Sequence, residues 1–231
     1  MRSSLLFQPL NLVRLREVSM KVYSYVVEHD NGYAPNPYFG FCTLCGCKFE
    51  GGKNIVQLAK VGDWVIGTGG VSKRSAQHGN LVYAMRVDKK LTRWGYFNCS
   101  QFEKKKPKTG TYAQSRGDNE DPRKDEHTEN SFWREAPKLN DRMREQFVLV
   151  SRHFWYFGAN AIPILEEFKG EKPHGFMLEK KGPGFRNHFE QADIHRLVEW
   201  IEGQAKPGRH GEPCGRTLDE LKGRIGCKSS C

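Results

Sequence analysis

The sequence VGDWVIGTGG, Val61 to Gly70, indicates a short buried strand that ends in glycines. A basic and polar segment follows it, and LVYAMRVDKKL, Leu81 to Leu91, then alternates apolar and polar residues as a second strand does. Two strands joined by a glycine-rich loop predict a hairpin. The loop is either a plain turn or a place where backbone amides approach a phosphate or a base.

Two more apolar runs indicate strands, and two helices are predicted near the end of the chain. KVYSYVVEHD, Lys21 to Asp30, has the pattern of a strand buried on both faces, and FVLVSRHFWYFG, Phe147 to Gly158, is rich in β-branched and aromatic residues. One helix is placed so that Asp193 caps it and Gly203 ends it. Its apolar positions are Ile194, Leu197, Val198 and Ile201. A second helix is expected from Thr217.

The order of these elements predicts the fold class. Strands come first and helices mainly follow, so we expect an α+β domain around a mostly antiparallel, partly closed sheet with C-terminal helices, and not a doubly wound sheet. We expect residues 1–19 to be a poorly ordered extension, residues 20–211 to form the domain and residues 212–231 to form a helical tail. The polar region from Thr92 to Gln146 is either disordered or a functional insertion.

The charge of the chain favours an anionic partner. Lysines and arginines number 37 against 27 aspartates and glutamates, which gives a formal net charge of +10. A positive surface attracts nucleic acid, although it also occurs on soluble proteins without such a partner. No apolar run approaches the roughly 18 residues that cross a bilayer. The seven cysteines without a clear signal peptide indicate a reducing compartment, so we expect a cytoplasmic protein with no membrane partner.

Closely spaced cysteines in CTLCGC make Cys42, Cys45 and Cys47 candidate metal ligands. A structural zinc site needs four ligands, and the sequence contains no second Cys-x-x-Cys pair. Buried cysteines in a tight turn are therefore the favoured interpretation. We expect no cofactor.

An acidic segment offers candidate catalytic residues. RGDNEDPRKDEH contains Asp118, Asp125 and His127, which suit a divalent cation or acid and base chemistry. Carboxylates that alternate with Arg123 and Lys124 are also typical of a solvated loop, and this second interpretation stays open.

The candidate nucleotide-binding residues come from loops and aromatic positions. The glycine-rich loop offers backbone amides, a hydroxyl and two cations to a phosphate, and the later loop GPGFRNHF offers groups that hydrogen-bond a base edge. An aromatic side chain would stack on the base. These candidates are Tyr38, Trp64, Gly67, Gly69, Gly70, Ser72, Lys73, Arg74, Asn119, Arg186 and Asn187.

Several segments in order resemble the nucleotide-modification-associated domain family, type two. They are MKVYSYVVEHDNGYAPNPYFGFCTLCGCK, KVGDWVIGTGG, LVYAMRVDKKLT, QFEKKKP, RGDN, FVLVSRHFWYFG followed by IP, and GPGFRNHF. The resemblance runs from Met20 to about Gly211. The family pattern marks Tyr25, Pro35, Asn36, Pro37, Gly40, Cys42, Thr43, Cys47, Gly62, Asp63, Trp64, Gly67, Tyr83, Asp118, Asn119, Tyr156, Phe157, Gly158 and Pro163. After RGDN this sequence departs from the family, because charged EDPRKDEH replaces an aromatic stretch.

The resemblance implies association with modified nucleic acid in bacterial or phage systems. The hairpin is also similar to the core of PUA-type barrels, which implies a PUA-like sheet. We therefore expect a domain that binds nucleic acid, above all DNA with a modified base, or a nucleotide, within a modification, restriction or defence system. The alternative is an enzyme that acts on a nucleotide or nucleobase through the region of Asp118, Asp125 and His127.

Overall fold

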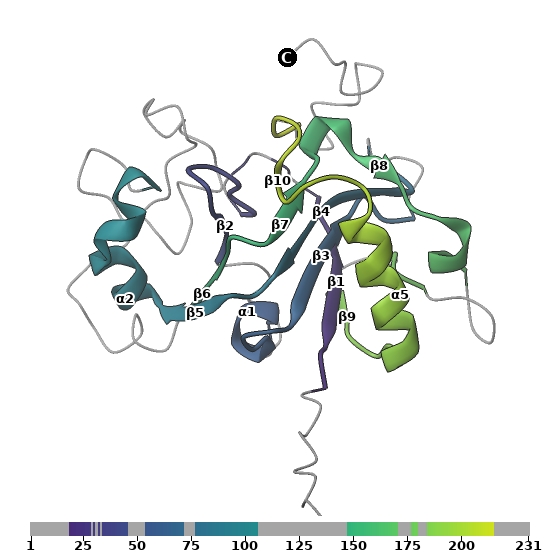
Figure 1. The fold of residues 1–231 in the computed structure, drawn as a ribbon, viewed down its shortest axis with the longest axis horizontal. Helices are drawn as coiled ribbons and strands as arrows, with labels where there is room; N and C mark the ends of the chain where they lie inside the picture. The colour runs from purple at the N-terminus through teal and green to yellow at the C-terminus, as the bar shows by residue number, and fades with distance from the viewer. Residues whose placement is uncertain are drawn as a thin grey trace, which may run out of the picture.

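The structure, a computed structural model, describes residues 19–28, 30, 32, 34–45, 54–71, 77–105, 147–170, 177–179 and 184–214 (Figure 1). The strands are β1 Val22–Val26, β2 Cys42–Cys45, β3 Trp64–Thr68, β4 Asn80–Arg86, β5 Lys89–Thr92, β6 Phe147–Ser151, β7 Phe154–Tyr156, β8 Ile162–Pro163, β9 Phe185–Arg186 and β10 Gly208–Arg209. The α-helices are α1 Ile55–Leu58, α2 Arg93–Asn98 and α5 Gln191–Glu202, and the 3-10 helices are η1 Ser100–Lys105, η2 Gly158–Asn160 and η3 Glu166–Phe168.

Within the described residues, the strands form a seven-stranded sheet and a three-stranded sheet. The larger has the order β10-β7-β4-β3-β1-β9 with β8 beside β4, and the smaller has the order β2-β6-β5. Among the described strands, only β1 with β3 and β10 with β7 pair in parallel, which confirms a mostly antiparallel α+β fold. The expected partial closure is wrong, because β10 and β9 end the larger sheet as two separate edges. The likeness to PUA-type barrels is not confirmed.

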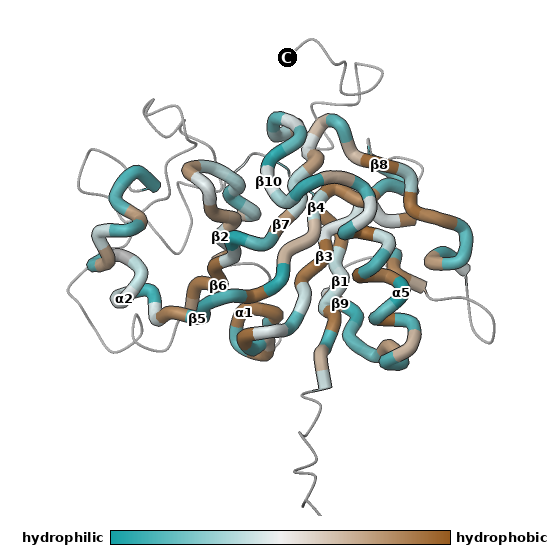
Figure 2. The backbone as a smooth tube through the Cα atoms, in the orientation of Figure 1, coloured by the Kyte–Doolittle hydropathy of each residue, from teal (hydrophilic) through white to brown (hydrophobic). Residues whose placement is uncertain are grey.

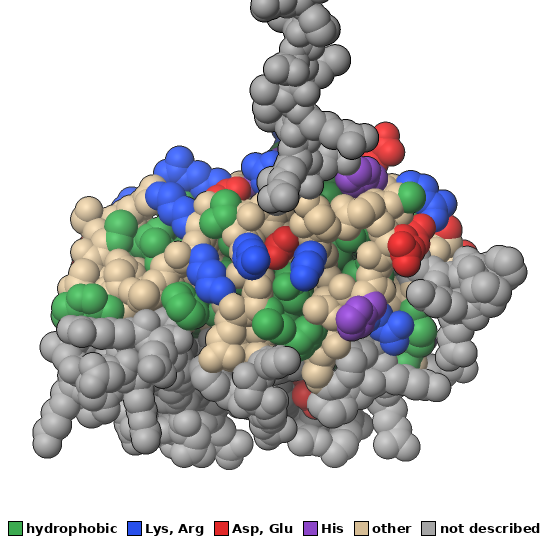
Figure 3. All heavy atoms as spheres, turned by 90° about the horizontal axis from the view of Figure 1, so that it is seen from below, with side chains coloured by type: hydrophobic (Ala, Val, Ile, Leu, Met, Phe, Trp, Pro, Cys, Tyr) green, Lys and Arg blue, Asp and Glu red, His purple; other side chains and the backbone are tan. Residues whose placement is uncertain are grey.

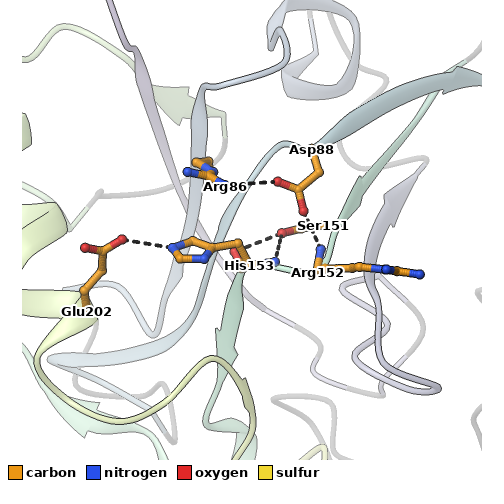
Figure 4. A network of polar contacts seen from close by, with 6 residues as sticks. All are labelled: Arg86, Asp88, Ser151, Arg152, His153 and Glu202. Carbon is orange, nitrogen blue, oxygen red and sulfur yellow. Dashed lines mark hydrogen bonds and ion pairs between the residues drawn. The ribbon is translucent and has the colours of Figure 1, made fainter.

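Two bent strands connect the sheets. Leu81 to Leu91 and Phe147 to Gly158, each expected as one strand, divide into β4 and β5 and into β6 and β7. The two bends are bonded to each other: the amide of Asp88 donates to the carbonyl of Val150 at 2.9 Å, and the amide of Arg152 donates to Asp88 Oδ2 at 2.6 Å (Figure 4). Each bent strand therefore takes part in both sheets.

The two faces of the larger sheet bury different apolar clusters, as expected for alternating side chains. On one face, Trp64 and Trp155 stack with ring centroids 5.8 Å apart, in the same cluster as the buried side of α5. On the other face, Val65 and Met85 pack with residues of α1 and of the smaller sheet. Figure 2 shows apolar residues along the strands and on parts of α1 and α5.

The helix α5 differs from its prediction at one end. It begins at Gln191 with Glu190 as its N-cap residue, and Gly203 ends it as predicted, with its amide bonded to the carbonyl of Glu199 at 3.0 Å. The expectation that Asp193 caps the helix is wrong. Asp193 lies in the first turn and pairs with Arg196 at 2.6 Å, where its charge still favours the helix dipole.

Part of the polar region after Thr92 packs onto the domain. Tyr96 of α2 and Phe102 of η1 are buried and stack with ring centroids 4.6 Å apart. Residues 106–146 lie outside the described part of the chain. Among the helices that the structure describes, none has the length and apolar character needed to span a bilayer.

Candidate functional site

A row of tyrosines crosses the larger sheet near the ends of β1, β3 and β7. These ends lie toward the top of the sheet in Figure 1. Tyr25 of β1 pairs with Gly67 of β3, Gly67 with Tyr83 of β4, and Tyr83 with Tyr156 of β7. Directly paired residues share a face, so the three tyrosines project to the same side of the sheet. They are almost completely buried.

Gly67 allows two of these tyrosines to meet. The hydroxyl groups of Tyr25 and Tyr83 lie 2.9 Å apart, and their rings make an edge contact at 6.1 Å across the strand between them. A Cβ atom at Gly67 would lie 2.3 Å from the ring of Tyr83 and 2.5 Å from a methyl group of Val27. The glycine therefore has a packing role, and its contact with a phosphate stays a prediction.

The third tyrosine bonds to a buried carboxylate. Tyr156 donates a short hydrogen bond from its hydroxyl to Asp30 Oδ1, and the amide of Cys214 donates to Asp30 Oδ2 at 3.1 Å. Asp30 is 5% exposed. Burial, and then the charge of Asp30, raise the pKa of Tyr156 well above its ordinary value, so the phenol stays protonated and remains a donor.

A buried lysine joins the loop after Asp30 to η1. The Lys105 ammonium donates to Asn36 Oδ1 at 2.5 Å and to the carbonyl of Asn36 at 3.1 Å. Both residues are buried, and the backbone of Asn36 is bridged to Thr43 by two 2.9 Å bonds. Burial lowers the pKa of Lys105 to about 7, and burial raises the pKa of the Cys42 thiol to about 12. Lys105 therefore changes its charge near neutral pH while the Cys42 thiol stays neutral.

The surface end of this cluster is formed by Tyr38, Arg209 and Glu212. The guanidinium of Arg209 lies 4.8 Å from the centre of the Tyr38 ring. The Tyr38 hydroxyl donates to Glu212 Oε2 at 3.3 Å, and Arg209 forms an ion pair with the same carboxylate. Tyr38 is half-buried, and its amide donates at 3.3 Å to Asn36 Oδ1, the oxygen to which Lys105 also bonds. A planar guanidinium over an aromatic ring is a surface on which a base can stack.

The segment after β10 holds these groups against the end of β7. The amide of His210 donates to the carbonyl of Tyr156, and the amide of Ala159 donates to the carbonyl of Glu212, both at 2.8 Å. The backbones pass so closely that a Cβ atom at Gly211 would lie 1.9 Å from the carbonyl oxygen of Phe157. Residues 212–214, which were predicted to begin a separate tail, thus contribute to the site.

The glycine loop uses its amides within the hairpin. The amide of Gly69 donates to the carbonyl of Asn80 at 2.9 Å, and the amide of Gly70 donates to Thr68 Oγ1 at 3.3 Å. A phosphate would have to displace these bonds to reach either amide. The described residues of the loop therefore form the end of the hairpin. A phosphate contact stays a prediction for Ser72, Lys73 and Arg74, which lie outside the described residues.

Other predicted residues lie away from this cluster. Trp64 is 1% exposed and stacks on Trp155, so its indole has no open face for a base. Arg186 and Asn187 lie at β9, where Arg186 pairs with Ser24, and three strands separate β9 from β7. Eight candidates lie outside the described residues: Cys47, Ser72, Lys73, Arg74, Asp118, Asn119, Asp125 and His127.

The two described cysteines of the predicted metal site point apart. Cys42 belongs to the cluster that contains Tyr83, whereas Cys45 packs with Phe102 on the far side of β2. Residues three apart on a strand face opposite sides, so this pair does not converge on one ion. The described part of the chain contains no group of three or more residues able to hold a metal ion.

His153, a possible general base, belongs to a structural network at the other end of β7. Its Nε2 lies 2.9 Å from Glu202 Oε1, but Ser151 Oγ bonds to the backbone of His153 and not to its ring (Figure 4). The imidazole also makes edge contacts with Trp64 and Trp155. Among the described residues, no nucleophile is bonded to this ring, and the network joins β7 to α5.

The sequence profile of the family described as nucleotide modification associated domain 2 (Nmad2) matches residues 19–220. The chain belongs to this family. The match confirms the resemblance and includes every residue of the cluster from Asp30 to Cys214. No curated protein and no solved structure matches the chain. Membership of the Nmad2 family associates the protein with nucleotide modification.

The Nmad2 pattern and the structure agree on part of the site. Asn36, Cys42, Tyr83 and Tyr156 were marked by the resemblance and lie in or beside the buried cluster. Sequence reasoning missed the functional candidates Asp30, Lys105, Arg209 and Glu212. A lone acid in a turn and the middle lysine of the run KKK carry no periodic signal, so only the fold could select them.

Proposed function

We propose that this domain binds a nucleotide or nucleic acid, above all DNA, whose base is modified, within a bacterial or phage modification, restriction or defence system. The base stacks at Tyr38 and Arg209, and the buried groups below select its polar substituents. One observation carries this proposal: the half-buried Tyr38, with a guanidinium 4.8 Å from its ring centre, is bonded through its amide to Asn36 of the buried polar cluster.

The chemistry of the cluster suits recognition of a modified base. Asp30 and the carbonyl of Asn36 are acceptors, the Tyr156 phenol and the Lys105 amine are donors, and all are held by the bonds described above. Because these groups already bond to one another, a ligand that displaces one of the bonds must supply a replacement, and a ligand that cannot do so is rejected. The affinity should therefore differ strongly between a base whose polar substituent replaces these bonds and a base that lacks the substituent. An added methyl group should change the affinity less.

The proposal is tested by fluorescence anisotropy with oligonucleotides of one sequence that carry an unmodified, methylated, hydroxymethylated or glycosylated base at one position. Wild-type protein should bind at least one modified oligonucleotide more tightly than the unmodified one. Tyr38→Ala should weaken that binding by about ten- to a hundredfold, since stacking contributes about 1–3 kcal/mol per base. Tyr38→Phe should retain most of the affinity.

A matched control is available on α2. Trp94 is an exposed aromatic residue, 39% accessible, outside the proposed site. Trp94→Ala should leave the affinity unchanged. Equal losses in Tyr38→Ala and Trp94→Ala would contradict a stacking role for Tyr38.

The alternative function, an enzyme acting on a nucleotide or nucleobase, rests on Asp118, Asp125 and His127. These residues lie outside the described part of the chain. Incubation with nucleotides tests it separately: turnover that Asp118→Ala abolishes would favour the enzyme.

A further inference from the structure

The lower end of the larger sheet, where β1 and β3 begin, carries a surface rich in cations. Figure 3 views the molecule from this end and shows lysine and arginine side chains gathered in its middle and to the left. Val22, Trp64 and Arg86 pair in one row, so the residues next to them in the chain share this end. We name as the lower basic surface Lys21, Lys60, Arg86, Lys90 and Arg152.

Asp63, the carboxylate at the centre of this surface, is already hydrogen-bonded to backbone amides. Asp63 is 6% exposed, and its two oxygens accept the backbone amides of Lys21 at 3.0 Å and of Lys60 at 2.9 Å. The side chains of Lys21 and Lys60 are exposed and take part in none of the ion pairs formed between described residues. Their positive charges therefore face solvent.

A third cation is fixed beside them. Lys90 donates from its ammonium to the carbonyls of Gln57 at 2.5 Å and of Ala59 at 3.0 Å, at the end of α1. Burial lowers the pKa of Lys90, Asp63 opposes this effect, and repulsion from Lys60 lowers the pKa further. The Lys90 ammonium lies 3.0 Å from the carbonyl of Ala59, the residue next to Lys60, so an external anion can interact with both cations.

The surface continues across the bend between the two sheets. Arg86 and Arg152 flank Asp88, which accepts the backbone amide of Arg152 at 2.6 Å and lies 3.6 Å from the Arg86 guanidinium. The Arg152 guanidinium itself packs over the ring of Phe41 at 4.8 Å. Five cations therefore share two carboxylates, and backbone amides satisfy much of the hydrogen bonding of both carboxylates.

We propose that the lower basic surface binds the phosphate backbone of a nucleic acid strand, so that the ligand of this domain is a polymer and not a free nucleotide. The inference deepens the proposed function and rests on it for the kind of ligand. The upper and lower ends are separated by the five residues of β3, a distance of about 17 Å at about 3.3 Å per residue. A single nucleotide reaches one end only, whereas a strand carries phosphates to both.

Salt dependence of binding tests this inference without a modified base. The probe is an unmodified oligonucleotide of about 20 nucleotides, titrated by fluorescence anisotropy at several salt concentrations, because each phosphate contact adds about 0.7 to 0.9 to the slope of log K against log salt. The variant is Lys21→Gln with Lys60→Gln. The control, Lys104→Gln with Lys169→Gln, removes one cation of η1 and one that directly follows η3, neither of which belongs to the lower basic surface.

We expect the lower-surface variant to bind the oligonucleotide at least tenfold more weakly and to reduce the slope by about 1.5 to 2. The control should change affinity less than twofold. An unchanged slope, or an equal loss in the control, overturns the inference. So does wild-type protein that binds vesicles containing phosphatidylserine but not the oligonucleotide.

The two proposals fail separately. Tyr38→Ala should lose the preference for a modified base while its salt slope with the unmodified oligonucleotide stays as in wild type. The lower-surface variant should show the reverse. A wild-type protein with no preference for any modified base would contradict the proposed function and leave the salt-slope test of the lower basic surface intact.

Discussion

The hydroxyl groups of Tyr25 and Tyr83 lie 2.9 Å apart across Gly67, although their strands β1 and β4 are not neighbours. The glycine of β3 leaves the space in which the two rings meet. This contact links the strand that leads to Asp30 with the strand that pairs with Tyr156. The row of tyrosines thus connects the strands that position Asp30 and Tyr156 of the buried polar cluster.

Replacement of Gly67 should disturb the packing of the tyrosine row. The Cβ atom of Gly67→Ala would lie 2.3 Å from the Tyr83 ring, so the rings must shift and the free energy of unfolding should fall by about 1–3 kcal/mol. Chemical denaturation measures the change. Gly203→Ala is the control, because a Cβ atom there is 3.4 Å from its nearest neighbour, the Glu199 carbonyl oxygen. Equal stability of the two variants would refute the packing role.

The Tyr156 and Asp30 pair should behave as a coupled unit. Asp30→Asn removes a charged acceptor from two donors, the Tyr156 hydroxyl and the Cys214 amide, so we expect a loss of about 1–3 kcal/mol in the free energy of unfolding. Tyr156→Phe removes one of these bonds. The double variant should lose clearly less than the two single losses combined. If the two single losses add to the loss in the double variant, the hydrogen bond contributes nothing to the free energy of unfolding.

Lys105 should make stability depend on pH between 7 and 9. Its ordinary pKa is 10.5 and its folded pKa is about 7, so above pH 7 the unfolded chain binds a proton that the folded protein does not. Stability contributed in this way rises as pH increases. The opposite holds for Cys42, whose pKa rises from 9.0 to about 12, so its contribution falls above pH 9.

The comparison that isolates Lys105 is the wild type with Lys105→Met. Between pH 7 and 9 the free energy of unfolding of the wild type should rise by about 2 kcal/mol more than that of the variant. Denaturant titrations at the two pH values provide the measurement. Parallel pH profiles would mean that the buried amine does not lose its proton in this range.

Trp64 should affect stability and not binding. Its indole stacks on Trp155 and contacts His153 inside the core. Trp64→Ala should lower the free energy of unfolding by about 3–5 kcal/mol, and Trp64→Phe by less. The folded Trp64→Phe protein should bind oligonucleotides with wild-type affinity. A selective loss of affinity in a stable Trp64→Phe variant would restore Trp64 to the site.

Periodic features of the fold were predictable from the sequence. The β3–β4 hairpin and the apolar side of α5 follow from local spacing, and both are confirmed. The bends at Asp88 and Arg152 were missed, because each lies in a segment whose strand-like pattern continues on both sides. Hydrogen bonds between residues distant in sequence hold these bends. The alternation of apolar and polar residues along the strand therefore shows no break where the strand passes from one sheet to the other.

The site was predictable only where a side chain had a local signal. Tyr38 was selected as an aromatic residue on a proline-rich loop, and Asn36 came from the family resemblance. The contacts of Asp30 span 126 residues to Tyr156 and 184 residues to Cys214. A pattern within one segment of the sequence cannot predict a contact between residues so far apart in the chain. Trp64, chosen for its chemistry, proved to be core because both faces of β3 are covered.

The most direct test of a modified-base site at Tyr38 is the affinity ratio between an oligonucleotide with a modified base and its unmodified counterpart, measured by anisotropy for wild type and Tyr38→Ala. We predict a ratio above ten for at least one modification in the wild type, and a ratio near one in Tyr38→Ala. A wild-type ratio near one for every modification, or a ratio that Tyr38→Ala leaves unchanged, would contradict recognition of a modified base at Tyr38.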